Sequence, residues 1–162
     1  MLKSLNSARA QLNFLKPQTA ENTVDMIDLR PLGVGEENFV ISSWLKSLRA
    51  HNAHYAAVPA EIYYEAHAQS IKNCIAENHC LVATPHGEPD IIIGYMVWED
   101  RGPKYVVLHY CYVKNSFRRI GLAKILVKMV AEGRTCYVTH YTNKILLKDL
   151  RFNPYFFKQE QF

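Results

Sequence analysis

The 162-residue sequence lacks the features of a membrane or secreted protein. No apolar run approaches the roughly 20 residues that a helix needs to cross a bilayer. The N-terminal residues 1–16 contain neither a compact apolar stretch nor a small-residue cleavage site, so they do not have the form of a secretory signal. We therefore expect a cytoplasmic protein with no membrane partner.

Cysteine is scarce and irregularly spaced. The four cysteines, Cys74, Cys80, Cys111 and Cys136, contain no CxxC pair, which argues against both a zinc site and a disulfide framework. His51 and His54 have no third ligand at the spacing of a metal site, so no bound metal is expected. A G-x-G-x-x-G motif is also missing, which disfavours a dinucleotide-binding fold.

The remaining composition is that of one ordinary globular domain, with 49% hydrophobic and 21% charged residues and no repeats or linkers. Residues 1–23 are predicted to form an N-terminal arm, either a frayed surface helix or a docking segment for a partner. Residues 24–162 form the single domain. The net charge of +4 is compatible with an anionic ligand but does not by itself indicate binding to DNA.

Hydrophobic periodicity predicts strands interrupted by helices. Strands are expected at residues 24–32, 80–84, 90–98, 104–114, 136–141 and 153–157. Helices are expected at residues 36–50, 60–78, 121–132 and, as a short element, 144–151. The turns HGEP and EDRGP are short enough to predict an antiparallel meander between the middle strands. A mixed sheet covered by helices accommodates this order.

The segment from the long strand into the third long helix carries the strongest chemical signal. Residues 113–131 include five cations and no Asp or Glu. Gly121 precedes the helix, whose N-terminus presents unpaired N–H groups and partial positive charge. Glycine allows a phosphate to approach this backbone closely. The pattern suits a pyrophosphate, although basic residues before a helix are also common as solvated surface.

The motif Arg118-x-x-Gly121-x-Ala123 resembles the Q/R-x-x-G-x-G/A signature of GNAT acetyltransferases. This resemblance implies an α/β (α+β) fold with a GNAT-like mixed, mostly antiparallel sheet flanked by helices and a shortened C-terminal part. It also implies acetyl-CoA as the co-substrate. Its pyrophosphate would rest on the backbone of Arg118, Arg119, Ile120, Gly121, Leu122 and Ala123. The pantetheine arm would pair near Tyr112 and Val113, and Asn143 is a weaker candidate for a contact.

The resemblance also implies catalytic positions. Many GNAT enzymes carry a Glu four residues before the Val that ends the long strand, and this position holds His109. A histidine there could act as a general base on the same strand face as Val113, or it could be a packed histidine. The family often uses a later Tyr to protonate the leaving thiolate. The matching stretch contains none, so Tyr141 is the substitute candidate.

The acceptor and the partners remain open at this stage. The first two helices supply an aromatic set that either lines an acceptor pocket or packs in the core: Trp44, His51, His54, Tyr55, Tyr63, Tyr64 and His67. A small-molecule or peptide amine is expected, and a homodimer could cover an open sheet edge.

The leading hypothesis is an acetyl-CoA-dependent N-acyltransferase. Residues 106–124 also resemble GNAT-like proteins of tailed phages, which would place the protein in bacterial or phage-infected host cytosol. This second resemblance keeps a DNA-base-modifying enzyme as an alternative, with DNA possible but not favoured as a partner. A catalytically silent GNAT-fold module for binding or assembly is the third reading.

Overall fold

The computed structural model describes residues 25–140 and 150–157. Their strands form one six-stranded sheet in the order β1-β2-β3-β4-β5-β6. Pairing is antiparallel from β1 to β4 and parallel between β4 and β5 and between β5 and β6. The strand bounds are β1 Ile27–Pro31, β2 His79–Pro85, β3 Gly94–Asp100, β4 Tyr105–Val113, β5 Thr135–Val138 and β6 Leu150–Phe152. The expected mixed, mostly antiparallel sheet flanked by helices is confirmed.

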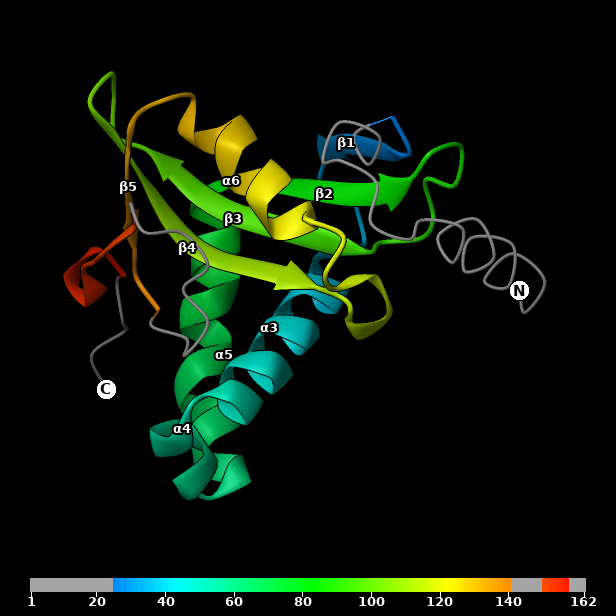
Figure 1. Cartoon of the computed structure of the whole chain (residues 1–162). Helices are drawn as coiled ribbons and strands as arrows, with labels where there is room; N and C mark the ends of the chain where they lie inside the picture. The colour runs from blue at the N-terminus through cyan, green and yellow to red at the C-terminus, as the bar shows by residue number, and fades with distance from the viewer. Residues whose placement is uncertain (1–24, 141–149, 158–162) are drawn as a thin grey trace.

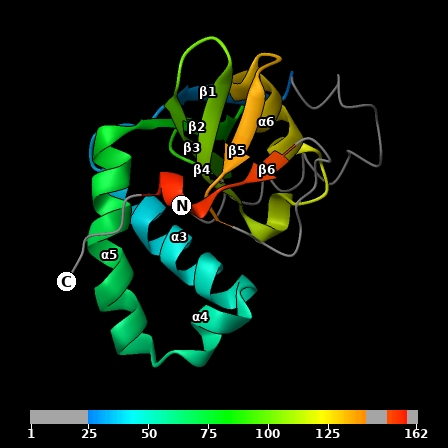
Figure 2. The ribbon, with the colours of Figure 1, turned by 90° about the vertical axis from the view of Figure 1, so that its left-hand side faces the viewer.

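Helices cover both faces of the sheet. The described α-helices are α3 Glu37–His51, α4 Ala53–Ala57, α5 Ala60–Glu77 and α6 Leu122–Ala131, and two 3₁₀ helices are η1 Asn115–Phe117 and η2 Pro154–Phe156. Figure 1 shows α6 lying across one face and α3 and α5 crossing the other, and the view turned by 90° in Figure 2 shows the same layers edge-on. The fold is therefore a three-layer arrangement with two hydrophobic cores.

Each core fills one interface between sheet and helices. Under α3 and α5, the fully buried side chains include Trp44, Tyr63 and Tyr95. Under α6, Leu122 and Leu126 pack against strand residues of the opposite sheet face. Burying each large apolar side chain contributes about 1.5–3 kcal/mol, so these layers hold the sheet rigidly between them. We name the two sides of the sheet the α3/α5 face and the α6 face.

Gly94 allows the start of α6 to pack closely on the sheet. A Cβ atom at this position would lie 2.8 Å from the carbonyl oxygen of Tyr112 and 3.0 Å from Cδ2 of Leu122. Real Cβ atoms do not approach backbone oxygen so closely, so a larger residue would push the helix or the strand away. The glycine thus fixes how closely α6 approaches the end of β4.

Several predicted boundaries were wrong for local reasons. The strand predicted at residues 90–98 begins only at Gly94, because a turn with Ile91 N–H bonded to the Glu88 carbonyl extends the preceding loop. The loop predicted at residues 51–59 contains α4, which Asn52 caps by accepting hydrogen bonds from two backbone N–H groups.

The C-terminal elements also differ from the prediction. Leu150 and Arg151, expected in a short helix, belong to β6, and residues 153–157 contain η2 rather than a strand. Pro154 cannot donate a hydrogen bond to a sheet, and the Asn153 side chain accepts from Tyr155 N–H, which favours a turn of 3₁₀ helix. The arm at residues 1–23 and most of the predicted helix at 144–151 lie outside the described residues. No helix in the described ranges is long and apolar enough to cross a membrane.

Candidate active site

The strands β4 and β5 separate half-way along β4. Their parallel pairing covers only Tyr105 to Leu108 of β4, and the last bond joins Thr139 N–H to the Leu108 carbonyl at 3.2 Å. Beyond it, β4 continues to Val113 paired with β3 alone among the described strands. The separation leaves the β5-facing edge of this part of β4 open to a ligand.

Backbone groups on this open edge alternate in direction. Lys114 N–H bonds to the Ile93 carbonyl on the β3 side at 2.9 Å, so Tyr112 also faces β3 in the antiparallel pattern. The backbone of Val113 therefore faces the open edge, and its carbonyl accepts a 3.1 Å hydrogen bond from Nε of Arg118. Of the two residues predicted to pair with pantetheine, Val113 has the better orientation in this pattern.

The predicted cofactor loop turns tightly between η1 and α6. Arg119 and Gly121 both adopt left-handed backbone conformations, with φ values of 71° and 85°. Gly121 is exposed and directly precedes α6, and its carbonyl accepts the first intrahelical bond, from Ile125 N–H at 3.1 Å. The N–H groups of the first helical turn therefore lack intrahelical acceptors. This end of α6 has the form of an anion-binding site.

The charges around the loop have one sign. Arg119, Lys124 and Lys128 are exposed, and no acidic residue lies in the first turn of α6. Leu122 is 1% exposed and anchors the helix start in the core under α6. The loop combines a tightly turned backbone with exposed cationic side chains, an arrangement that suits a pyrophosphate.

His109 lies at a β-bulge in β4. Val97 pairs with Tyr110 whereas the next residue, Trp98, pairs with Leu108, so His109 is the extra residue. Its ring packs against Phe157 of the α3/α5 core, while Val113 packs against the α6 core. The expectation that His109 and Val113 share a face was therefore wrong, because the bulge breaks the two-residue alternation.

His109 is buried among polar neighbours rather than open to solvent. Its side chain is 3% exposed, and its Nδ1 lies 3.4 Å from Thr139 Oγ1. Its carbonyl oxygen accepts from Thr139 Oγ1 at 3.2 Å and from His140 Nδ1 at 2.9 Å. Its Nε2 has no hydrogen-bond partner among the described residues and lies 3.7 Å from Oε2 of Glu99. The bulge is thus held by the two residues that follow β5.

Both imidazoles of this cluster are neutral at pH 7. Burial lowers the pKa of His109 to about 4, and the positive charge of Arg101 acts in the same direction. The Glu99 carboxylate, at 3.7 Å, does not offset this burial. Burial also lowers the pKa of His140 to about 4, although its hydrogen bond to the His109 carbonyl opposes the shift. Neutral histidines are able to accept a proton.

The other predicted site residues are placed as follows. Tyr141 and Asn143 lie outside the described residues. Trp44 and Tyr63 are fully buried, and Trp44 stacks on Tyr110 at 4.8 Å, so these two aromatic residues pack in the core. Tyr55, Tyr64 and His67 form ring contacts around Tyr63, whereas His51 and His54 are exposed. Most of the aromatic set therefore serves packing. The described residues contain no cluster that could hold a metal.

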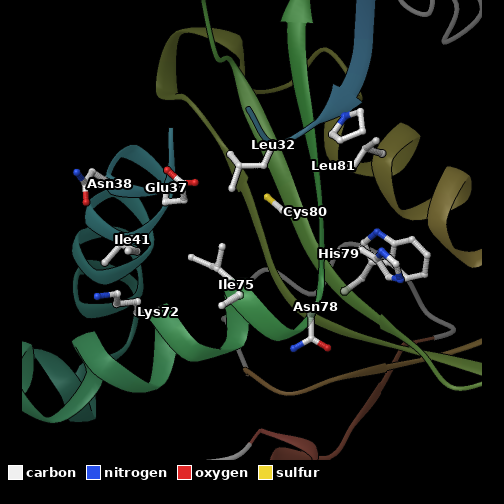
Figure 3. A pocket seen from close by; sticks show the side chains of 13 residues that line it. Leu32, Glu37, Asn38, Ile41, Lys72, Ile75, Asn78, His79, Cys80 and Leu81 are labelled. Atoms are coloured by element: carbon white, nitrogen blue, oxygen red, sulfur yellow. The ribbon is translucent and has the colours of Figure 1, made fainter. Parts of the chain in front are cut away.

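A cavity of about 790 Å³ lies away from the loop and from His109. Figure 3 shows Leu32, Ile75 and Cys80 pointing into it, with the α3 residues Glu37, Asn38 and Ile41 along one side. It opens near β1 and β2, on the far side of β3 from the separation of β4 and β5. Its position separates it from the open edge of β4 and from the loop before α6.

A family model for the acetyltransferase (GNAT) family matches residues 45–142, more than half of the chain. The match includes β4, the loop, α6 and β5. The chain belongs to the GNAT acetyltransferase family. It is an acetyltransferase, and like other members of this family it uses acetyl-CoA. No curated protein sequence matches the chain.

Solved structures with TM-scores above 0.5 share the fold of this GNAT acetyltransferase. A possible acetyltransferase from Clostridium difficile 630 is 10% identical, with a TM-score of 0.51 over 75% of this chain and 83% of the other. A second, from Pyrococcus horikoshii, is 12% identical, with a TM-score of 0.53 over 74% and 82%. The PaiA N-acetyltransferase from Thermoplasma acidophilum, solved with coenzyme A, is 17% identical, with a TM-score of 0.46 over 65% and 70%.

Sequence reasoning missed three polar residues that surround His109. Glu99, Thr139 and His140 all contact His109, yet they come from β3 and from the residues after β5. The stretch CYVTHY was predicted as a strand through residue 141, which would have sent Thr139 and His140 to opposite faces. Because β5 ends at Val138, both side chains turn toward the same bulge.

Proposed function

We propose that this GNAT acetyltransferase is an N-acetyltransferase that transfers the acetyl group of acetyl-CoA directly to an amine. The observation that carries the proposal is the open edge of β4 beyond Leu108, which leads to the cationic loop at the start of α6. An extended, amide-containing arm suits the edge, and a pyrophosphate suits the loop. Both parts of one cofactor are thus accommodated along a single path.

In this proposal, the loop residues Arg118 to Ala123 bind the pyrophosphate through backbone N–H groups and cationic side chains. The backbone of Val113 would orient the pantetheine arm. The hydrogen bond from Nε of Arg118 to the Val113 carbonyl would then break, or the carbonyl would accept from both Arg118 and the arm. An amine nitrogen then attacks the thioester carbonyl carbon, the C–S bond breaks, and coenzyme A leaves. His109 belongs to the system that removes the amine proton, and Tyr141 remains the candidate acid for the thiolate.

The acceptor is proposed to be a small-molecule or peptide amine. A DNA substrate has less support, because the cations that are clustered in sequence lie around one short loop instead of along an extended surface. The protein is proposed to act in the cytoplasm. A homodimer that covers an edge of the sheet remains a proposal as well.

The test begins with calorimetry of the full chain against acetyl-CoA. We expect binding, and we expect weaker binding of a pantetheine thioester that lacks the pyrophosphate. Polyamines, aminoglycosides, peptides and nucleosides are then screened for release of free coenzyme A thiol, with acetylated product identified by mass spectrometry. A folded protein that binds no acetyl-CoA would refute the proposed function.

A further inference from the structure

A line of polar atoms runs from the surface of β3 to the point where β4 and β5 separate. It begins at the carboxylate of Glu99, whose Oε2 lies 3.7 Å from Nε2 of His109. On the other side of that ring, Nδ1 lies 3.4 Å from Oγ1 of Thr139. Oγ1 in turn lies 2.9 Å from Nδ1 of His140. These four side chains form a continuous series, which we name the histidine chain.

The hydrogen bonds at His140 fix its tautomer. Its Nδ1 lies 2.9 Å from the backbone carbonyl oxygen of His109, and a carbonyl oxygen only accepts hydrogen bonds. Nδ1 therefore carries the hydrogen. In the neutral ring, Nε2 is then the atom with the free lone pair, and no described residue bonds to it. This nitrogen is available as a proton acceptor.

Electrostatics fix the tautomer of His109 in the opposite sense. Its buried Nε2 faces the carboxylate of Glu99, which also pairs with Nε of Arg101 at 2.8 Å. A lone pair directed at a carboxylate is repelled, whereas an N–H directed at it is attracted. Nε2 therefore carries the hydrogen, and Nδ1 holds a lone pair 3.4 Å from Oγ1 of Thr139. The single hydroxyl hydrogen of Thr139 is donated to the His109 carbonyl oxygen at 3.2 Å, and rotation of the hydroxyl directs it to Nδ1 instead. At 3.7 Å the contact with Glu99 is longer than a hydrogen bond, so the last proton transfer of the relay requires the carboxylate to approach Nε2.

The N–H at Nδ1 of His140 lies 2.9 Å from both the carbonyl oxygen of His109 and Oγ1 of Thr139, so both acceptors share it. With the Thr139 hydroxyl turned from that carbonyl to Nδ1 of His109, the donors of the histidine chain point from His140 toward Glu99. We propose that His140 is a catalytic base of this acetyltransferase and that Thr139 and His109 relay its proton to Glu99. The inference rests on the proposed function, because it supplies the base for acetyl transfer to an amine. It assigns His109 a relay role, which explains why a residue at the family's base position is buried.

The proposed step transfers the amine proton along the histidine chain while the acetyl group moves to the amine. The amine nitrogen bonds to the thioester carbon and gives its proton to Nε2 of His140. Nδ1 of His140 passes its proton to Oγ1 of Thr139, the hydroxyl proton moves to Nδ1 of His109, and Nε2 of His109 protonates Glu99. The C–S bond breaks and leaves coenzyme A as the thiolate. Reverse passage along the chain then delivers a proton from His140 to the thiolate, so the net proton transfer is from amine to thiol.

The surroundings favour a relay over a charged imidazole. The ring of His140 contacts Trp44, Tyr110 and Phe157. Positive charge on His109 or His67 disfavours a positive charge on His140. Glu99 and Arg101 face the ring of His109 from β3 and from the turn after it. A proton that moves through both rings leaves neither one positively charged, and it ends on a partly exposed carboxylate.

The alternative is that Thr139 and His140 only cap the carbonyl oxygen in the bulge. Nuclear magnetic resonance of the ¹⁵N-labelled full chain separates the two readings without an acceptor. We expect His140 protonated at Nδ1, His109 protonated at Nε2, and both rings neutral from pH 7 to 5. Protonation of His140 at Nε2, or of His109 at Nδ1, overturns the relay.

Turnover tests the catalytic part, with the amine found in the acceptor screen or with water as the acceptor of the acetyl group. Thr139→Val keeps the shape but removes the hydroxyl, and we expect kcat to fall about 100-fold with unchanged acetyl-CoA affinity. Thr139→Ser should restore turnover, and His140→Gln should lose as much as Thr139→Val. The exposed His86, changed to Gln, is the matched control and should keep full activity.

Different results would overturn the proton relay and the proposed acetyl transfer. A folded Thr139→Val protein with wild-type turnover overturns the relay and leaves acetyl transfer standing. A wild-type protein that binds no acetyl-CoA refutes the proposed function, while the ring tautomers still decide whether the histidine chain exists.

Discussion

Acid should destabilise this protein well before its carboxylates titrate. His109 and His140 are neutral in the folded state, and burial lowers the pKa of each from the ordinary value of 6.5 to about 4. The unfolded chain takes up protons at these rings as the pH falls through 6.5, while the folded chain does not until about pH 4. The stability that the neutral rings provide is therefore fully present above pH 6.5 and is lost between 6.5 and 4.

The size of the loss follows from the two pKa values. A pKa difference corresponds to about 1.4 kcal/mol per unit, so each ring contributes about 3 kcal/mol over the whole window. Between pH 7 and pH 5 the loss is about 2 kcal/mol for each ring and about 4 kcal/mol for the pair. This is a large part of the 5–15 kcal/mol that typically stabilises a domain. His67, whose pKa burial also lowers, adds to the loss in the same direction.

Urea unfolding at pH 7, 6 and 5 measures the effect. The double variant His109→Gln, His140→Gln removes both titrating groups, and its free energy of unfolding should change much less with pH than that of the wild type. His86→Gln is a control of opposite sign, because hydrogen bonding to Asp28 raises the pKa of His86. It should not reduce the acid sensitivity. Equal pH dependence in the wild type and the double variant would refute the reasoning.

Three further predictions concern the cofactor loop and the partners. Gly121→Glu should abolish acetyl-CoA binding in calorimetry, because it places a negative charge at the start of α6. Gly102 has a similar left-handed φ and similarly open surroundings, so Gly102→Glu is the matched control. Both variants should lose about 1–2 kcal/mol of stability, but the Gly102→Glu protein should bind acetyl-CoA normally. Gly94→Ala should cost about 1–3 kcal/mol and weaken acetyl-CoA binding, because its Cβ would displace Leu122 at the start of α6; an unchanged melting temperature and affinity would contradict this. Duplex DNA should give no gel shift at low salt, and a complex whose affinity falls steeply with salt would instead support DNA as the substrate.

The sequence predicted the glycine turn before α6 well because its determinants are local. A glycine between a cationic stretch and an amphipathic helix fixes the loop by backbone freedom and helix polarity alone. The structure places Gly121 directly before α6 with a positive φ, as the motif requires.

The C-terminal part was predicted poorly because its pairing is not local. Leu150 joins the sheet by pairing in parallel with Cys136. A parallel strand carries no turn signal in the sequence, since its partner is distant along the chain. The three-residue strand β6 also has too few residues to show alternation. Only the tertiary position of β5 decides that these residues extend the sheet.

The most consequential miss was the β-bulge at His109. Counting by two from Val113 gave the correct residue of β4 but the wrong face, because one extra residue without a β3 partner reverses the alternation on either side of it. The same extra residue leaves two carbonyl oxygens, those of Leu108 and His109, directed toward the residues after β5. Thr139 and His140 satisfy them, and this arrangement leaves Nε2 of His140 without a hydrogen-bond partner among the residues that the structure describes. The irregularity that defeats the sequence pattern is thus the feature that assembles the proposed base.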